Sequence, residues 1–239
     1  MTDDPRPEPD RRDEIARALA EVERRIGEAC VAAGRDRGEI TLIAVTKTYP
    51  ASDVRLLAEL GVTNVGENRD QEAAAKARDC AGLPLTWHFI GRLQTNKARS
   101  VVSYAAMVHS VDRIRLVQAL SAAAGQAGRQ VDCLVQVSFD DDPGRGGAGP
   151  EDVPALAAAV AEAPGLRLRG VMTVAPLGGD PGKAFAELRS IAETVRTEHP
   201  GATIISAGMS GDLSQAIANG ATHVRVGTAL LGRRKPFVR

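Results

Sequence analysis

Short apolar runs alternate with alanine-rich amphipathic segments along most of the chain. In the first run, the near-continuous hydrophobicity of residues 42–45 is typical of a strand that is covered on both faces. Similar runs recur along the rest of the chain, and the pattern predicts strands over residues 41–46, 63–65, 86–90, 106–110, 131–137, 168–171, 203–206 and 223–226. Strands that alternate with helices form right-handed βαβ units, so the sequence predicts a parallel sheet.

The number of these units distinguishes between two α/β folds. Eight units in roughly 190 residues is typical of a compact (β/α)8 TIM barrel, which is the fold we expect. A doubly wound open sheet is the alternative, because the runs over residues 63–65 and 203–206 are short. Before the first strand, apolar residues recur at helical spacing through residues 11–34, and Gly34 stands where a C-terminal cap is expected. The barrel is therefore expected to carry an extra N-terminal helix.

Length and composition favour one large domain. The 239 residues are 44% hydrophobic, which is enough to bury a sizeable core. We expect a disordered tail over residues 1–12, which mix acidic, basic and proline residues, and a single domain over residues 13–239. The sequence holds neither the apolar region of a signal peptide nor the ~18 uninterrupted apolar residues of a membrane span. The lone cysteines Cys30, Cys80 and Cys133 form no CxxC pair, which favours a reducing compartment, and we expect a cytoplasmic protein.

The charge balance restricts the class of ligand. The 30 basic and 30 acidic side chains cancel, so no overall field attracts the protein to nucleic acid or to an anionic membrane. A small, locally recognised ligand is favoured instead. No long apolar stripe is left over once the helices of the barrel have been placed, and we expect a monomer.

The segments that follow the predicted strands carry most of the polar chemistry, and the active site of a TIM barrel is built from these segments. Lys47 follows the first strand, Asn68 lies in "GENRDQE" after the second, and His88 lies in "WHFIGRLQTNK". Each has an ordinary alternative explanation. A lysine at the end of a strand usually extends into solvent, an asparagine beside a glycine can form a turn, and a lone histidine is more often part of the core. Likewise, the glycine-rich loop that contains residues 145–147 is by default a mobile surface loop.

The loops after the seventh and eighth strands predict a phosphate site. Ser210 is placed to cap the helix in "GDLSQAIANG", and Gly227–Thr228 offers bare backbone directly after the eighth strand. A helix start presents unpaired N–H groups to an anion, and these two loops are the usual phosphate site of such barrels. A phosphorylated ligand follows from this interpretation. The alternative is a pair of turns in which the glycines only provide flexibility.

A lysine that faces a phosphate site across the barrel mouth indicates a particular cofactor. A lysine amine forms a Schiff base with a carbonyl, and a phosphate-bearing aldehyde that needs such a lysine is pyridoxal 5′-phosphate (PLP). A PLP site also needs a partner for the pyridine nitrogen, either a carboxylate or an arginine. Arg225 lies at the end of the eighth strand, two residues before the predicted phosphate turn.

Five segments together resemble a known family. The segments are "LIAVTKTYP", "GENRDQE", "WHFIGRLQTNKAR", "GVMTVAP" and "SAGMSGDLSQAIANGATHVRVGTALLG". They are similar to the pyridoxal phosphate homeostasis proteins, which are single-domain relatives of the alanine racemase barrel. The resemblance runs in order from about Ile15 to Gly232, and the combination of motifs is highly specific.

The resemblance implies a barrel like the alanine racemase N-terminal domain, with PLP as a Schiff base on Lys47. It implies that Ser210 and the amides of Gly227 and Thr228 bind the phosphate, and that Arg225 faces the pyridine nitrogen. It also places Asn68 and His88 along the pocket and Met209 near the cofactor. The implied site residues are Lys47, Asn68, His88, Met209, Ser210, Arg225, Gly227 and Thr228.

Two positions depart from the family pattern. Relatives commonly have Ser before the lysine and Lys-Pro after it, where this chain has Thr46 before it and Thr48 and Tyr49 after it. The loop after the fifth strand commonly carries Lys-Gly where this chain has Arg145–Gly146. A hydroxyl is kept before Lys47, whereas the cation of the loop is no longer an amine.

Three functions from different classes remain at this point. An arginine beside the pyridine nitrogen disfavours its protonation and weakens the ring as an electron sink, and only seven residues follow Gly232 to supply an opposing acid or base. Both features favour a protein that holds, buffers and delivers PLP with little or no turnover, with apo-PLP enzymes as transient partners. A PLP-dependent amino-acid racemase is the first alternative. An aldolase-type barrel, whose lysine attacks a substrate carbonyl without any cofactor, is the second.

Overall fold

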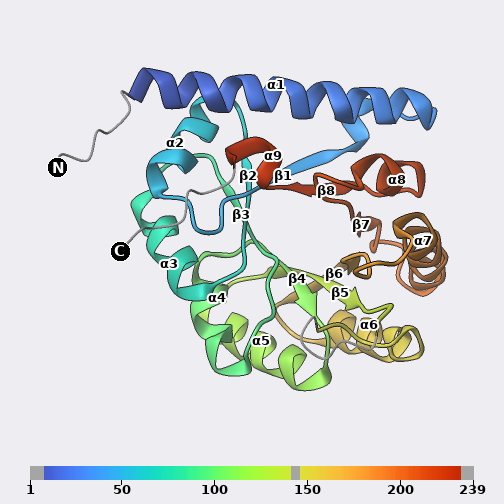
Figure 1. Cartoon of the computed structure of the whole chain (residues 1–239). Helices are drawn as coiled ribbons and strands as arrows, with labels where there is room; N and C mark the ends of the chain where they lie inside the picture. The colour runs from blue at the N-terminus through green and yellow to red at the C-terminus, as the bar shows by residue number, and fades with distance from the viewer. Residues whose placement is uncertain (1–7, 141–145, 233–239) are drawn as a thin grey trace.

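The computed structural model of the chain describes residues 8–140 and 146–232, which form a closed barrel of parallel strands in sequence order (Figure 1). The first strand pairs with both the second and the last, so the barrel closes between β1 and β8. The predicted (β/α)8 barrel is confirmed, and the open sheet is wrong. The strands are β1 (Thr41–Val45), β2 (Asn64–Glu67), β3 (Thr86–Phe89), β4 (Met107–Val111), β5 (Val131–Val137), β6 (Leu166–Thr173), β7 (Ile204–Ser206) and β8 (His223–Val226).

Helices surround this barrel and connect its strands, as Figure 1 shows. Short 3₁₀ turns precede β1, α4 and α6, at Arg37–Glu39, Thr95–Lys97 and Pro150–Asp152. The α-helices are α1 (Glu8–Ala32), α2 (Ala51–Glu59), α3 (Asp70–Asp79), α4 (Ala98–Tyr104), α5 (Ile114–Ala127), α6 (Val153–Glu162), α7 (Pro181–Glu198), α8 (Leu213–Ala218) and α9 (Thr228–Leu231).

Several strand boundaries differ from prediction: β6 extends two residues further at each end, and the end of β2 matters most for the site. The sequence predicted residues 63–65, but the strand extends to Glu67, because Gly66 and Glu67 pair with His88 and Phe89 of β3. Glycine and glutamate have low strand propensity, so neither residue gave a local signal. Closure of the barrel, which pairs each strand on both sides, overrides this local preference. The extension matters because it places Glu67 directly behind Lys47.

The extra N-terminal helix is present and is longer than predicted. Helix α1 begins at Glu8 rather than after residue 12, so residues 8–12 of the predicted tail belong to the helix, and residues 1–7 lie outside the described part. Ile15, Val22 and Ile26 are fully buried in one cluster with residues of β1, β8 and α9. The helix crosses the outside of the barrel along α8 and α9 (Figure 1). It therefore packs on the two helices that follow the predicted phosphate loops.

The interior of the barrel is unusually polar. His109 of β4 contacts Ser206 of β7, and because these strands are not neighbours, the contact crosses the barrel interior. His88, His109, Ser206 and Arg225 are each at most 4% exposed. The apolar core lies instead mostly between the strands and the surrounding helices, where Phe89 and Phe185 are among the largest buried side chains. Hydrogen bonds, rather than apolar packing alone, therefore organise the barrel interior.

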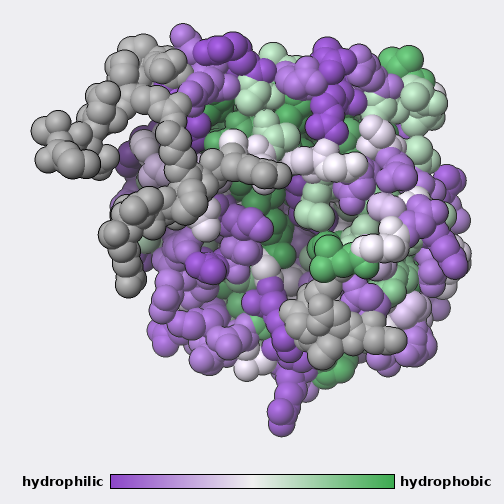
Figure 2. Space-filling model, viewed as in Figure 1, coloured by the Kyte–Doolittle hydropathy of each residue, from purple (hydrophilic) through white to green (hydrophobic). Residues whose placement is uncertain are grey.

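Other features of the described residues agree with the composition. None of the described helices combines the length and apolar character needed to cross a bilayer. The three cysteines are free and buried, and the described residues hold no cluster of side chains suited to a metal ion. Figure 2 shows a mostly hydrophilic surface on this face, with hydrophobic residues in small separate areas.

Candidate functional site

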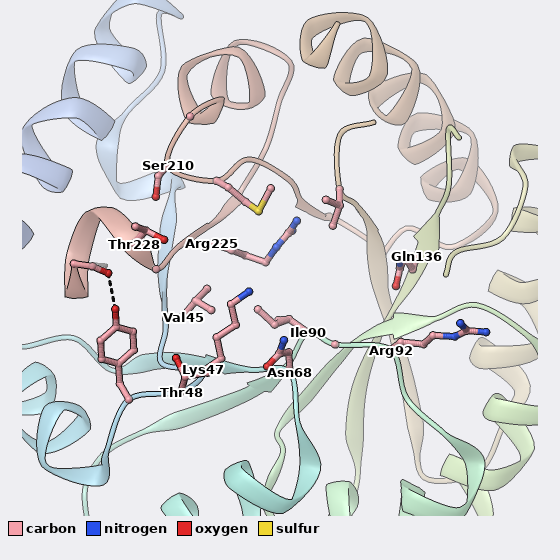
Figure 3. A pocket seen from close by; sticks show the side chains of 17 residues that line it. Val45, Lys47, Thr48, Asn68, Ile90, Arg92, Gln136, Ser210, Arg225 and Thr228 are labelled. Atoms are coloured by element: carbon pink, nitrogen blue, oxygen red, sulfur yellow. Dashed lines mark hydrogen bonds between the residues drawn. The ribbon is translucent and has the colours of Figure 1, made fainter. Parts of the chain in front are cut away.

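A pocket of about 830 Å³ opens among the loops that follow the strands, which is where TIM barrels build their active sites. It is lined by residues that follow β2, β3, β6 and β7, by residues in and after β1 and β8, and by Gln136 of β5. Figure 3 shows Lys47 and Arg225, from the end of β1 and from the neighbouring β8, extending into it, with Asn68 beside Lys47. The pocket therefore brings an amine, a guanidinium and a carboxamide together at one end of the barrel.

Lys47 is exposed at the mouth of the pocket, but the backbone on its N-terminal side is held by a buried ion pair. The Lys76 ammonium donates to the Thr46 carbonyl (2.6 Å) and to Glu67 Oε1 (2.5 Å), and the Thr46 hydroxyl donates to the same oxygen (2.6 Å). Burial raises the pKa of Glu67, against the opposing effects of Lys76 and Thr46. A charged cluster thus fixes the peptide that carries the pocket lysine.

The backbone on the C-terminal side of Lys47 is held differently. Thr48 adopts φ of 68°, and no other described residue except glycine has a positive φ. Its N–H donates to Glu72 Oε2 (3.2 Å). A β-branched residue in this region is strained, because its side chain approaches the backbone. Lys47 therefore lies between two peptides whose positions are set by side chains of β2 and α3.

Arg225 is held from behind by neutral groups. The guanidinium donates to Ser206 Oγ (2.7 Å) and to the Thr173 carbonyl (2.7 Å). Ser206 contacts His109 Nδ1 (2.9 Å), and His109 Nε2 contacts His88 Nδ1 (2.9 Å). His88 Nε2 then contacts the side chain of Asn64 (2.9 Å), near the opposite end of the barrel. Arg225 is therefore the end member of a hydrogen-bonded chain through the barrel interior.

The direction of this chain follows from its last member. Asn64 donates its amide N–H to Thr63 Oγ1 (3.2 Å) and presents its carbonyl oxygen to His88, so His88 Nε2 carries a proton. Nδ1 of His88 is then an acceptor, His109 Nε2 is the donor, and His109 Nδ1 accepts from the Ser206 hydroxyl. The oxygen of Ser206 remains free to accept from the guanidinium. Every donor in the chain meets an acceptor with both rings neutral.

Burial sets the protonation states in this chain. It lowers the pKa of His88 to about 3 and that of His109 well below its ordinary value, and neighbouring cations and imidazoles act in the same direction. Burial also lowers the pKa of Arg225 to about 10. At neutral pH the histidines are therefore uncharged, while the guanidinium remains a cation that can only donate hydrogen bonds.

The predicted phosphate side is made of loop backbone and hydroxyl groups. The sequence suggested that Ser210 caps the following helix, but it does not. Helix α8 begins at Leu213, and Asp212 occupies the N-cap position. The reason is a turn over residues 209–212, in which the Asp212 carboxylate accepts from the Met209 N–H (2.5 Å). The Ser210 hydroxyl is therefore not used in helix capping.

Glycine brings the loop after β8 close to β1. A Cβ added at Gly227 would lie 3.3 Å from both the Cβ and the carbonyl oxygen of Val45, tighter than most real contacts. A larger side chain at this position would push the backbone out of the pocket wall. Gly227 and Thr228 both line the pocket, and their contact with a phosphate stays a prediction.

The structure brings seven of the eight predicted site residues to the pocket wall, and His88 is the exception. His88 is 2% exposed and acts on Arg225 only through His109 and Ser206. Its side chain points into the barrel interior because His88 lies in β3 rather than in the following loop. The seven residues on the wall are Lys47, Asn68, Met209, Ser210, Arg225, Gly227 and Thr228.

Several wall residues were not predicted individually. Tyr49 donates its hydroxyl to the Gly232 carbonyl and so joins the β1 loop to the end of α9 (Figure 3). Val174 and Arg92 also line the pocket, from the "GVMTVAP" and "WHFIGRLQTNKAR" segments. Their segments had been singled out, but a single chain gives no signal that separates a wall residue from its neighbours in a loop. Arg145, in the glycine-rich loop after β5, lies outside the described residues.

Comparisons with known proteins agree on the family. The family described as "Alanine racemase, N-terminal domain" matches residues 19–235. The pyridoxal phosphate homeostasis protein of Mycobacterium tuberculosis (strain ATCC 25618 / H37Rv) is 44% identical over 246 residues, covering 95% of each chain. The protein of the same name from Pseudomonas aeruginosa is 42% identical over 220 residues, covering 92% of this chain and 96% of its own.

Solved structures give the same result. PipY of Synechococcus elongatus, solved with PLP bound, has 37% sequence identity and a TM-score of 0.80, covering 91% of this chain and all of the PipY chain. An alanine racemase from Clostridium difficile has a TM-score of 0.73 at 16% identity, and the match spans 58% of that chain, so it shares the fold alone. The chain belongs to the pyridoxal phosphate homeostasis protein family, which is built on the alanine racemase N-terminal domain.

Proposed function

We propose that this protein binds PLP in the pocket at the barrel mouth, through a Schiff base on Lys47, and takes part in the intracellular homeostasis of PLP. The observation that carries the proposal is the shared pocket of Lys47, Arg225 and the Ser210 and Gly227–Thr228 loops. The names of its relatives and the PLP bound to PipY support the same cofactor. When bound, PLP supplies an aldehyde that reacts with amines.

The described residues fit such a ligand. Asn68 Oδ1 is buried and has no hydrogen-bond partner among the described residues, so a polar ligand group at the pocket wall would satisfy it. Lys47 would hold the aldehyde carbon, and Ser210 with the amides of Gly227 and Thr228 would bind the phosphate. Gly227 leaves the backbone accessible because it carries no side chain.

Arg225 would determine how the ring behaves. A guanidinium has no acceptor, and its cation disfavours a second positive charge nearby, so a pyridine nitrogen facing it accepts a hydrogen bond and stays unprotonated. An unprotonated ring withdraws electrons weakly and stabilises carbanions poorly. We therefore propose a role in holding and delivering PLP, with little or no turnover.

Racemisation would need a second proton-transfer group opposite Lys47. Among the described wall residues, Tyr49 is the only other side chain of a type that commonly transfers protons. The Tyr49 hydroxyl already donates to the Gly232 carbonyl.

The protein would act as a monomer that meets apo-PLP enzymes transiently. Sedimentation of the holo-protein measures its mass in solution.

The covalent link is tested by spectroscopy and peptide mapping. The purified protein should be yellow, and borohydride should bleach the band and leave a stable secondary amine on Lys47. Lys47→Ala should fold but lose the band, since Lys47 is exposed at the end of a strand. Lys97→Ala, in a neighbouring loop, is the matched control and should keep it. An adduct mapped to another lysine would overturn the assignment.

The function is tested by two parallel assays. The holo-protein, incubated with L- and D-amino acids in deuterated water, should exchange no α-proton, and it should transfer PLP to an apo-PLP enzyme while free PLP is trapped. Robust exchange with inversion of one amino acid would replace the proposed role by racemisation. Failure of the transfer assay would remove delivery from the proposal.

A further inference from the structure

Arginines of α1 and of the turn that follows it donate to backbone carbonyls around the predicted phosphate loops. Arg25 donates to the Ser210 carbonyl (2.6 Å), and Arg11 donates to the Leu231 carbonyl (3.1 Å) at the end of α9. Arg35, just after α1, donates to carbonyls at the end of α8 and in the turn after it (3.0 and 2.7 Å). Helix ends leave such carbonyls unpaired, so these contacts fasten α8 and α9 to α1.

The contact made by Arg25 differs from the other two because Ser210 is in the pocket wall. Ser210 and Gly211 both line the pocket, whereas the carbonyl of Ser210 is turned toward α1. In a planar trans peptide the carbonyl and the following N–H point in opposite directions. The N–H of Gly211 is therefore directed away from α1, to the side on which the pocket lies.

The loop has little else to fix this peptide. A Cβ added at Gly211 would meet nothing within 4 Å, so the backbone after Ser210 has few steric restraints, whereas Gly208 is held by the hydrogen bond from the Arg225 N–H to its carbonyl (2.9 Å). The turn over residues 209–212 is closed by the hydrogen bond from the Asp212 N–H to the Met209 carbonyl (3.2 Å) and by the bond from the Met209 N–H to the Asp212 carboxylate. Both bonds leave the central Ser210–Gly211 peptide with two orientations, since turns of types I and II differ in the direction of this peptide. Among the described residues, Arg25 donates the hydrogen bond that holds the carbonyl of this peptide.

We propose that Arg25 is a positioning residue for phosphate recognition, holding the Ser210–Gly211 peptide so that its N–H and the Ser210 hydroxyl face the phosphate of PLP. This inference rests on the proposed function and adds a residue of α1 to its site. Arg25 does not touch the ligand, and acts by orienting a donor that does. Its cationic charge on the far side of the peptide also polarises the N–H toward the anion.

The test compares ligands that differ only in the phosphate. Arg25→Met keeps the aliphatic stem that packs along the helix but removes the donor. We expect its affinity for PLP to fall about ten- to a hundredfold, the range of one hydrogen bond to a charged group, while its affinity for pyridoxal is unchanged. Both affinities are measured by absorbance titration of the full-length apo-protein.

Matched variants separate positioning from general stability. Arg24→Met alters the neighbouring arginine, which pairs with Glu21 and Glu28 on the exposed face, and should change neither affinity. Arg35→Met removes a brace at the far end of α8 and should lower the unfolding temperature without changing the ratio of PLP to pyridoxal affinity. Arg25→Lys retains a cationic donor and should restore part of the loss.

The outcomes distinguish the inference from the function on which it rests. If the wild type binds no PLP, the proposed function fails before Arg25 is tested. If the wild type binds PLP but Arg25→Met lowers both affinities equally, or neither, the positioning role is wrong and Arg25 is only a brace. If Arg25→Met fails to fold, Arg25→Lys decides by the same ratio: a loss confined to PLP supports positioning, and equal changes in both affinities contradict it.

Discussion

Two buried polar clusters stand behind the pocket, and they are built on opposite principles. The lysine-side cluster is charged and the arginine-side cluster is a chain of neutral groups that ends on a cation. The lysine-side cluster consists of Thr46, Glu67 and Lys76, and the arginine-side cluster of Asn64, His88, His109, Thr173, Ser206 and Arg225.

The difference follows from what each cluster has to hold. The lysine-side cluster fixes a backbone carbonyl, and an ammonium paired with a carboxylate does this without leaving a net charge near the amine of Lys47. The arginine-side cluster fixes a cation that must remain available to the pocket. A carboxylate behind Arg225 would neutralise it, whereas neutral hydroxyl, imidazole and carbonyl groups orient it and leave its charge in place.

The two clusters also respond to pH with opposite signs. Burial raises the pKa of Glu67 above 4.5, so its contribution to stability is present below pH 4.5 and is lost as the pH rises through the raised value. The pKa values of His88 and His109 are lowered from 6.5, so their contribution is present above pH 6.5 and is lost as the pH falls. Neutral pH is therefore favourable to the histidine chain and unfavourable to the carboxylate.

The largest effect is expected from breaking the charged cluster. Lys76→Met leaves the fully buried Glu67 carboxylate with only the Thr46 hydroxyl as partner. Removing one member of a buried ion pair costs about 3–5 kcal/mol, and we expect a loss of this size in urea unfolding at pH 8. The loss should shrink toward pH 5, because protonation of Glu67 removes the unpaired charge.

The double variant provides the control for this prediction. Lys76→Met combined with Glu67→Gln buries no charge, keeps an acceptor for Thr46 and should recover most of the lost stability. If Lys76→Met costs less than about 1 kcal/mol at every pH, water or a rearrangement supplies the missing partner. The contrast between a charged and a neutral cluster would then be wrong.

An intermediate effect is expected from the neutral chain in acid. Burial lowers the pKa of His223 to about 4 as well, so the buried His88 and His109 and the partly buried His223 bind protons on unfolding below pH 6.5. Each contributes about 1.4 kcal/mol per pH unit to the loss of stability. His109→Gln can keep the hydrogen bonds to Ser206 and His88 but does not titrate, so the acid slope should fall by about one proton.

Unfolding free energies between pH 7 and pH 4.5 measure this slope. His199→Gln is the matched variant, at a histidine outside the arginine-side cluster. An unchanged slope in His109→Gln would mean that His109 binds its proton in the folded barrel. In that case the histidines of the arginine-side cluster would carry a charge, and both clusters would be charged.

The sequence was informative about the fold because periodicity and strand count are local signals. Alternating runs predicted all eight strands, but not all of their ends: Gly66 and Glu67 carry little strand signal, and β6 extends two residues further at each end than predicted. The start of α1 was placed too late because its first turn carries Pro9 and charged residues, which resemble a tail in sequence. Its apolar stripe begins only at Ile15.

Site residues could be predicted from the sequence only where a residue type and its position at the end of a strand together indicated a function. Lys47, Arg225 and the two glycine-containing loops were found in this way. The groups behind them were not, because Lys76 meets Thr46 thirty residues away and Ser206 meets His109 across the barrel. Such contacts depend on closure of the barrel, and no local pattern in the chain encodes them.

The smallest effect is expected from the strained residue beside Lys47. Thr48 occupies φ of 68°, a region that asparagine adopts far more easily than a β-branched residue. Thr48→Asn keeps the N–H that donates to Glu72 and should raise the free energy of unfolding by about 0.5–1 kcal/mol. Thr203→Asn, at an exposed threonine without positive φ, is the control and should change little.

The same substitution tests whether the charged cluster imposes this strain. Lys76 holds the carbonyl of Thr46, two residues before Thr48, so in the Lys76→Met background the backbone around Lys47 can relax and the gain from Thr48→Asn should fall toward zero. Equal gains in both backgrounds would show that the strain is local to the turn and to Glu72. In that event the lysine-side cluster holds the strand but not the conformation of the residue that follows Lys47.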